Sequence, residues 1–251
     1  MTNTTSTIKR LSKQQYDSYW DNGFLTVKDV FSKDEIDKLK NECRRLWNYV
    51  EVTNQNDRIQ WRIGAGGKKV ADRIDPVLDL SPMFQDLVDD ERLLTLANDI
   101  INAQVGLFKL KLISKWPGTE GYKMHQDYAY WNFVGDIPFD HFITVLIPLD
   151  PFTPMSGATE VFPKLHHHRL EGPAEQILDV DESKMDLSKG VILDLSPGDV
   201  AFFHGMTPHR SNINQSRHNR ESLFITYVKS GHGNLYGSYY SGRAKDFLKI
   251  K

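Results

Sequence analysis

The stretch Leu107-Phe108-Lys109-Leu110-Lys111-Leu112 marks the point where the chain changes from helical to strand-like patterning. Leucines alternate with lysines there, and a period of two is typical of a β-strand. Further β-branched and apolar runs follow, and turn signals such as Asp150-Pro151 and Pro197-Gly198 separate them; these runs cover 142–149, 157–162, 191–195, 200–203 and 223–228. Many short strands with regular turns indicate a sandwich or a barrel.

The first hundred residues carry helical signals instead. Ser32 and Glu35 form a capping box, in which the serine hydroxyl accepts a backbone N–H and the glutamate reaches back. Behind it, apolar side chains recur at steps of three and four, as expected for one face of a helix: Ile36, Leu39, Cys43, Leu46, Trp47 and Val50. Further helices are expected around 13–20 and after Ser81-Pro82.

The segment 54–75 is polar and contains three glycines, so a long loop is expected there. Loops of this length in a compact domain often serve as lids or binding loops. With no linker or repeat in the chain, the sequence predicts one mainly β domain of the α+β class over residues 1–251. In it, a helical lead-in at about 12–102 packs on a double-sheet barrel at about 105–230.

Composition excludes several classes of function. The 251 residues include 31 basic and 33 acidic ones, so the chain has no electrostatic footprint for nucleic acid or an anionic membrane. The single Cys43 excludes an internal disulfide framework and a cysteine-rich zinc site. No apolar run approaches the roughly 18 residues of a membrane span, and Met1–Ile8 lacks the features of a secretory signal. A cytoplasmic protein is expected, and the sequence carries no signal of its oligomeric state.

His125-Gln126-Asp127 is the first candidate for chemistry. Residues i and i+2 of an extended segment point to the same side, so this pair can converge on one ion, with a third ligand from a distant strand such as His204 or His209. Two imidazoles and one carboxylate on one side of a metal form the facial triad of non-haem Fe(II) oxygenases. A bare His-x-Asp tripeptide is a weak signal, because a chain of this composition contains one by chance about as often as not.

The surrounding motifs strengthen the interpretation. Their order is Pro117-Gly118, His125-Gln126-Asp127, Tyr130-Trp131, Ile143 to Asp150, Ser156 to Pro163, Pro197-Gly198-Asp199, Phe203-His204-Gly205, and then His209, Ser211, Asn214 and Arg220. Arg220 lies 11 residues after His209. In these motifs the chain, from about Lys13 to Val228, resembles the phytanoyl-CoA dioxygenase-like (PhyH) family of Fe(II)/2-oxoglutarate oxygenases.

The resemblance implies a double-stranded β-helix of the jelly-roll or cupin type that uses Fe(II), 2-oxoglutarate and O2 to hydroxylate, or otherwise oxidise, a small molecule. It implies His125, Asp127 and His209 as iron ligands, since only His209 has the spacing to Arg220. It also implies that Arg220 holds the distal carboxylate of 2-oxoglutarate, because a planar guanidinium suits bidentate carboxylate binding. The hydroxyls that match cosubstrate-binding positions belong to Ser211, Thr144 and Ser114, and the candidates for contact with the substrate are Trp131, Tyr128 and Arg62.

Two other functions remain open from the residues alone. A zinc hydrolase would suit the same ligands but leaves Arg220 without a role. A non-catalytic jelly-roll binding protein is the other alternative, and the intact ligand set speaks against it. The run His166-His167-His168 departs from the Pro-Gly-Ser-His often found in the family, and it is expected to be a solvated or packed loop. The carboxylate of Asp127 favours hydroxylation, because halogenating relatives carry a small residue there.

Overall fold

The helices begin where the sequence supplies capping side chains. In a computed structural model that describes residues 10–249, Ser12 caps α1 (Lys13–Asn22) and Ser32 caps α2 (Lys33–Val52). Both caps are complete capping boxes, so the box expected at Ser32 and Glu35 is confirmed. The helix expected after Ser81-Pro82 is divided at Asp89 and Asp90, since Ser81 caps α3 (Pro82–Val88) and Asp90 caps α4 (Glu91–Ile101). Met1–Ile8, the segment judged not to be a secretory signal, lies outside the described residues.

Two antiparallel sheets make up the barrel in the described part of the chain. The larger sheet has the spatial order β1 (Phe24–Val27), β8 (Val200–His204), β5 (Phe142–Pro148), β10 (Arg220–Lys229), β4 (Val105–Lys115), β3 (Lys69–Ile74) and β2 (Ile59–Ile63). The smaller sheet has the order β7 (Val191–Ile192), β6 (Thr159–Val161) and β9 (His209–Ser211). The two-sheet jelly-roll architecture expected from the sequence is confirmed.

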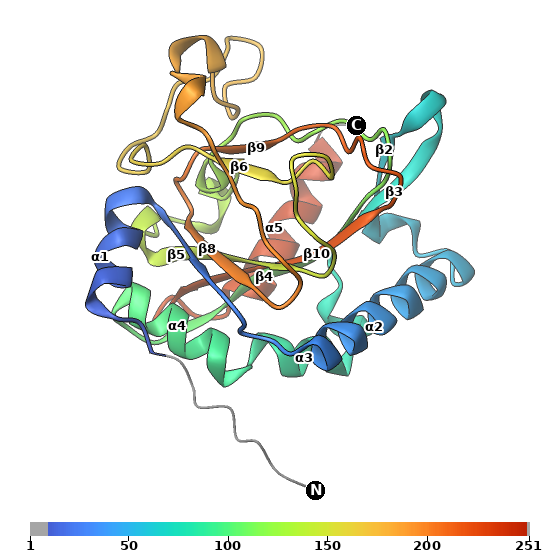
Figure 1. The fold of residues 1–251 in the computed structure, drawn as a ribbon, viewed down its shortest axis with the longest axis horizontal. Coiled ribbons are helices and arrows are strands. Elements are labelled where there is room, and N and C mark those ends of the chain that lie inside the picture. The colour runs from blue at the N-terminus through green and yellow to red at the C-terminus, as the bar shows by residue number, and fades with distance from the viewer. Residues whose placement is uncertain (1–9, 250–251) are drawn as a thin grey trace, which may run out of the picture.

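Helices α1 to α4 cover one face of the larger sheet, and the smaller sheet lies over the other (Figure 1). Leu110, Val145 and Ile225 of the larger sheet share one apolar cluster with Leu46 and Leu96 of the helices. The residues that point to the opposite face form a second cluster between the two sheets: Ile113, Leu146, Ala201, Phe203 and Phe224 with Val161, Leu193 and Leu195. The side chains of β4, β5 and β10 therefore alternate between the helical layer and the barrel interior.

The prediction of a long loop over 54–75 was wrong, because β2 and β3 form a hairpin there. Ile59 and Ile74 are buried where the two strands pair at the base of the hairpin. Arg73 and Ile74 also pair with β4, and this joins the hairpin to the larger sheet. The glycines occupy the turn between the strands, where Gly66 and Gly67 adopt positive φ angles.

The last helix in the described residues is α5 (Leu235–Lys249), which was not expected from the sequence. Leu235 and Tyr239 pack with Phe108, Trp131 and Phe142 in an aromatic cluster at one end of the barrel. No helix within residues 10–249 is long and apolar enough to cross a membrane.

Candidate active site

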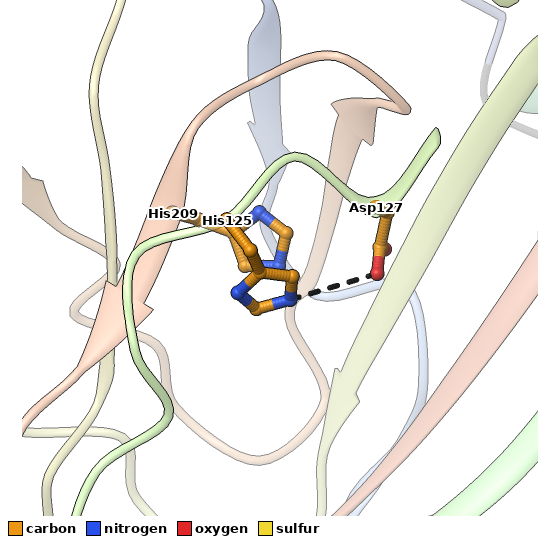
Figure 2. Close-up of side chains that lie close together, drawn as sticks. All are labelled: His125, Asp127 and His209. Atoms are coloured by element: carbon orange, nitrogen blue, oxygen red, sulfur yellow. Dashed lines mark ion pairs between the residues drawn. The ribbon is translucent and has the colours of Figure 1, made fainter. Parts of the chain in front are cut away.

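The backbone brings His125 and His209 side by side. The two residues form an antiparallel bridge in which each backbone N–H donates to the other residue's carbonyl at 3.0 Å. Their ring centres lie 4.2 Å apart. With Asp127, each residue offers a ligand atom within 4.8 Å of the other two, and Figure 2 shows the three side chains converging.

Backbone carbonyls fix the orientation of both imidazoles. The Nδ1 atom of His125 lies 2.7 Å from the carbonyl of Lys123, and Nδ1 of His209 lies 2.9 Å from the carbonyl of Thr207. A carbonyl can only accept, so each Nδ1 carries the hydrogen, and Nε2 is the ring nitrogen left to bind a metal. Burial, together with His125, lowers the pKa of His209 to about 3, so this imidazole is neutral.

Asp127 supplies the charge of the site. Burial by itself raises the pKa of this carboxyl, but the charge of Lys109, the nearby imidazole of His125 and the charge of Lys111 hold it well below its usual range. Oδ1 of Asp127 lies 3.7 Å from Nε2 of His125 and 3.9 Å from Nζ of Lys109. Oδ2 accepts a hydrogen bond of 3.3 Å from the Thr144 hydroxyl. Two imidazoles and an ionised carboxylate on one side of a common point fit a non-haem Fe(II) centre.

Arg220 lies in a cavity beside the metal ligands. The cavity is lined by Lys111, Ile113, Tyr122, His125, Thr159, His209, Arg210, Ser211, Arg220 and Phe224. Only 3% of Arg220 is exposed, and its guanidinium lies 3.9 Å from the centre of the Phe152 ring. Its Nη1 donates to the carbonyl of Gly157 at 2.7 Å, whereas its buried Nε has no hydrogen-bond partner. Burial lowers the pKa of Arg220 to about 10, and it forms no ion pair within residues 10–249. A buried guanidinium without a carboxylate partner suits an anionic ligand.

Ser211 lines the same cavity as Arg220, and its hydroxyl hydrogen is available for a further hydrogen bond. Its Oγ accepts hydrogen bonds of 3.0 Å from the backbone N–H of Tyr122 and from Nζ of Lys115. The O–H can then donate into the cavity, toward the same ligand as Arg220.

Lys115 is a member of this site that the sequence reasoning missed. It is fully buried, pairs across the strands with Arg220, and donates to the carbonyl of Gly157 at 3.3 Å as well as to Ser211. Burial, and then the charge of Arg220, lower its pKa to about 7. The signal in the sequence was its position, since Lys109, Lys111 and Lys115 share one face of β4.

Four other candidate residues are not among those that line the cavity of Arg220: Thr144, Ser114, Trp131 and Tyr128. Thr144 bonds to Asp127 and to Thr226, so it supports a metal ligand. Ser114 shares the helix-facing side of β4 with Leu110 and Leu112, away from the cavity, and its buried hydroxyl has no hydrogen-bond partner. The two aromatic candidates belong to the cluster around α5, where Trp131 is 1% exposed and the Tyr128 hydroxyl donates to the carbonyl of Ile137.

Arg62 connects the hairpin to the segment that leads to His125. It donates to the carbonyl of Gly121 at 2.9 Å, and its guanidinium lies 4.6 Å from the centre of the Tyr122 ring. Asp72 of the same hairpin accepts a hydrogen bond from the Tyr122 hydroxyl.

The remaining histidines lie elsewhere. His204 packs against Trp20 and His166, and His166 bonds to the carbonyl of Trp20. Among the described residues, His125, Asp127 and His209 form the one group of three or more potential ligands that lie close enough to share an ion.

The family described as phytanoyl-CoA dioxygenase (PhyH) matches residues 19–222. The chain belongs to the PhyH family. Among curated relatives, methylphosphonate hydroxylase of Gimesia maris is 23% identical to this chain. The match covers 96% of this chain and 89% of that protein. The 2-aminoethylphosphonate dioxygenase of an uncultured bacterium is also 23% identical, with coverages of 94% and 88%.

This PhyH chain also shares its fold with solved structures. EctD from S. alaskensis, crystallised with 2-oxoglutarate and 5-hydroxyectoine, superposes with a TM-score of 0.75 at 21% identity, over 90% of this chain and 79% of that one. The resemblance inferred from the ordered motifs is confirmed, and so is the enzyme class: this PhyH member is an Fe(II)/2-oxoglutarate-dependent dioxygenase. Neither a zinc hydrolase nor a non-catalytic binding protein receives support.

Proposed function

We propose that this enzyme hydroxylates a small organic substrate at an iron held by His125, Asp127 and His209, with 2-oxoglutarate anchored by Arg220 and Ser211. The observation that carries the proposal is the pairing of two features in one cavity. Three ligand atoms lie within 4.8 Å of one another, and a buried guanidinium without an acidic partner lies beside them. Iron needs the first feature, and a dicarboxylate cosubstrate needs the second.

When bound, iron with 2-oxoglutarate and O2 supplies the oxidation, which yields succinate, CO2 and an oxidised substrate. The residues of the chain orient and shield this chemistry. Lys123 and Thr207 aim the imidazoles through their carbonyls, while Thr144 and Lys109 hold the carboxylate of Asp127. Arg220 and Ser211 bind the far carboxylate of the cosubstrate, and the burial of the pocket excludes competing water.

The names of the relatives support a small substrate. Both curated relatives described above are named for organophosphonates of a few heavy atoms. The proposal for this chain is therefore oxidation of a C–H bond in a free small molecule. Because Asp127 occupies the third ligand position, the proposed outcome is hydroxylation without halide.

The test is turnover of 2-oxoglutarate by the purified protein reconstituted with Fe(II). Succinate release is measured with a panel of methylphosphonate, 2-aminoethylphosphonate, ectoine and amino acids, with Zn(II)-loaded protein as the matched control. The expected result is Fe(II)- and O2-dependent succinate formation that at least one substrate stimulates. Equal activity with zinc, or hydrolysis without consumption of 2-oxoglutarate, would contradict the proposal.

A further inference from the structure

We propose that Lys109 and Lys111 form a binding site for an oxyanion carried by the primary substrate, so that this enzyme acts on small anionic molecules. The inference rests on the proposed function, since it places the substrate beside the iron ligands. It goes further by assigning the substrate a charge and by naming the residues that recognise it.

Both lysines lie on the face of β4 that points away from the helices. Strand β4 alternates between its two faces, and Leu110 and Leu112 point to the helical layer. Lys109 and Lys111 therefore point into the barrel interior, a direction that usually belongs to apolar side chains. Only 4% of Lys109 is exposed. Lysines are rarely buried unless they are paired with an acidic group. Within the described residues Lys109 has one such partner, Asp127, and Lys111 has none in an ion pair.

A β-bulge holds Lys109 in this position. The register of β4 against β10 shifts between Thr226 and Tyr227, which pair with Lys109 and Leu107 and leave Phe108 as the extra residue. Consecutive side chains consequently reach the same two rings. Phe108 lies 5.1 and 4.9 Å from the ring centres of Trp131 and Tyr239, and Nζ of Lys109 lies 4.4 and 5.7 Å from them. Bulges often re-aim a side chain next to an active site.

The charges around the metal site also favour an anionic substrate. Asp127 is the acidic partner of Lys109, at 3.9 Å, and its carboxylate becomes an iron ligand in the proposed function. The two positive charges of Fe(II) then add to the site. The two carboxylates of 2-oxoglutarate are matched by iron and Arg220, while Lys115 adds a further cation beside Arg220. The loaded site consequently keeps an excess of positive charge on the side of Lys109 and Lys111.

Lys111 is the cation that is free to act. It forms no hydrogen bond or ion pair within the described part of the chain, and its Nζ lies 5.0 Å from the centre of the Phe224 ring. It lines the same cavity as His125 and His209. Burial, and then the charge of Lys109, lower the pKa of Lys111 to about 7, so an oxyanion placed near the iron would favour the ammonium form and accept its hydrogen bond.

The source of the oxyanion is tested by comparing substrate and cosubstrate. A carboxylate of 2-oxoglutarate is the alternative ligand of Lys111, and this would make the lysine part of the cosubstrate site. We infer the substrate instead, because Arg220 and Ser211 already serve the far carboxylate. Lys109 lies between Asp127 and the rings of Trp131 and Tyr239, and it is not among the residues that line the cavity of Arg220.

The experiment uses Lys109→Met and Lys111→Met, which remove the charge at nearly constant volume. Lys109→Arg and Lys111→Arg restore the charge, and Lys38→Met, at an exposed position on α2, is the matched control. Under anaerobic conditions, the Fe(II) protein is titrated with 2-oxoglutarate and then with methylphosphonate, phosphite or acetate. The neutral ester dimethyl methylphosphonate is the uncharged probe. The readout is the metal-to-ligand charge-transfer band, which responds to both kinds of ligand without turnover.

The expected result is that at least one of the three anions perturbs the band of the wild-type protein, whereas the neutral ester does not. Each methionine variant should raise the dissociation constant for that anion by tenfold or more, the loss expected for one charge-assisted hydrogen bond. The arginine variants should recover most of the affinity, and the dissociation constant for 2-oxoglutarate should change by less than threefold.

Three outcomes would overturn the inference: no response to any of the anions, an equal response to the neutral ester, or a loss confined to 2-oxoglutarate. A protein that never develops the band would instead refute the proposed function. The 2-oxoglutarate titration of each variant also reports whether its iron site is still folded, so a misfolded methionine variant is recognised and replaced by the neutral Lys109→Gln or Lys111→Gln.

Discussion

At the scale of single residues, the iron ligands are oriented by groups that any sequence could supply. The carbonyls of Lys123 and Thr207 lie two residues before His125 and His209 and accept their Nδ1 hydrogens. Mutation of these partner residues leaves a carbonyl in place. The carboxylate of Asp127, in contrast, depends on the side chains of Thr144 and Lys109.

Asp127→Gly is expected to abolish hydroxylation and to weaken iron binding by at least about tenfold. The variant loses an ionised ligand, and interactions with charged groups contribute on the order of 1.5–3 kcal/mol. Added chloride is not expected to produce efficient chlorination by this variant, because halogenation also needs a positioned substrate. Iron titration and product analysis check both statements. Wild-type hydroxylation rates from Asp127→Gly would mean that the carboxylate is not a ligand.

Arg220→Lys is expected to raise the dissociation constant for 2-oxoglutarate about ten- to a hundredfold while iron affinity stays unchanged. Lysine keeps the charge but loses the planar fork, and one charge-assisted hydrogen bond contributes about 1.5–3 kcal/mol. Titration of 2-oxoglutarate into the anaerobic Fe(II) protein measures this. Arg45→Lys, at an exposed position on α2, serves as the control. An unchanged dissociation constant in Arg220→Lys would remove Arg220 from the cosubstrate site.

The sequence could identify the metal-ligand candidates because short spacings survive folding. Positions 125 and 127 share a side in any extended segment, and the interval from His209 to Arg220 belongs to a recognisable family pattern. Lys109, Lys111 and Lys115 were missed for a physical reason. Alternation shows that two sets of side chains lie on opposite faces, but it does not show which face is covered. Lysines on one face of a strand normally mean solvent, whereas here the smaller sheet covers that face.

At the scale of elements, the hairpin 59–74 supports the approach to His125. Its Arg62 and Asp72 bond to Gly121 and Tyr122, in the segment that leads from β4 to the metal ligands. The sequence did not predict the hairpin, because Gly64, Gly66 and Gly67 and the charged residues around them are typical of loops. Pairing with β4, a contact distant in sequence, determines the strand.

Gly121→Ala is expected to destabilise the protein by about 1–3 kcal/mol and to lower its affinity for iron. A Cβ at Gly121 would lie 1.5 Å from the carbonyl oxygen of Ser211, so the segment before His125 must move away from β9. Denaturant unfolding and iron titration measure the two effects. Gly106→Ala is the control, because the nearest atom to its Cβ is the Ser230 hydroxyl at 3.9 Å, and a change within about 0.5 kcal/mol is expected. Equal stabilities for the two variants would contradict the close approach.

At the scale of the whole molecule, His204 ties the helical lead-in to the barrel. It lies on β8 with 1% exposure, packs against Trp20 of α1 and against His166, and accepts a hydrogen bond of 3.0 Å from the backbone N–H of Met206. Burial, and then the charges of His166 and His167, lower the pKa of His204 to about 3.

This burial predicts acid sensitivity of the fold. The pKa of an unfolded histidine is about 6.5, so the unfolded chain binds a proton that folded His204 rejects. The stabilisation is fully present above about pH 6.5, and it is lost toward pH 3 at about 1.4 kcal/mol per pH unit. Denaturant unfolding of iron-free protein between pH 7 and 5 should show a shallower slope for His204→Asn, which keeps an acceptor near the position of Nδ1. Identical slopes for the two proteins would mean that His204 is not buried in its neutral form.

The assignment of the iron to His125, Asp127 and His209 is tested most directly by iron stoichiometry under anaerobic conditions. Three proteins are compared: wild type, His209→Ala and His204→Asn. Each is titrated with Fe(II) in the presence of saturating 2-oxoglutarate, and the metal-to-ligand charge-transfer band is followed to its endpoint. One iron per chain and a full band are expected for the wild type and His204→Asn, and the band should be lost in His209→Ala. A full band in His209→Ala together with its loss in His204→Asn would contradict the assignment of the iron to His125, Asp127 and His209.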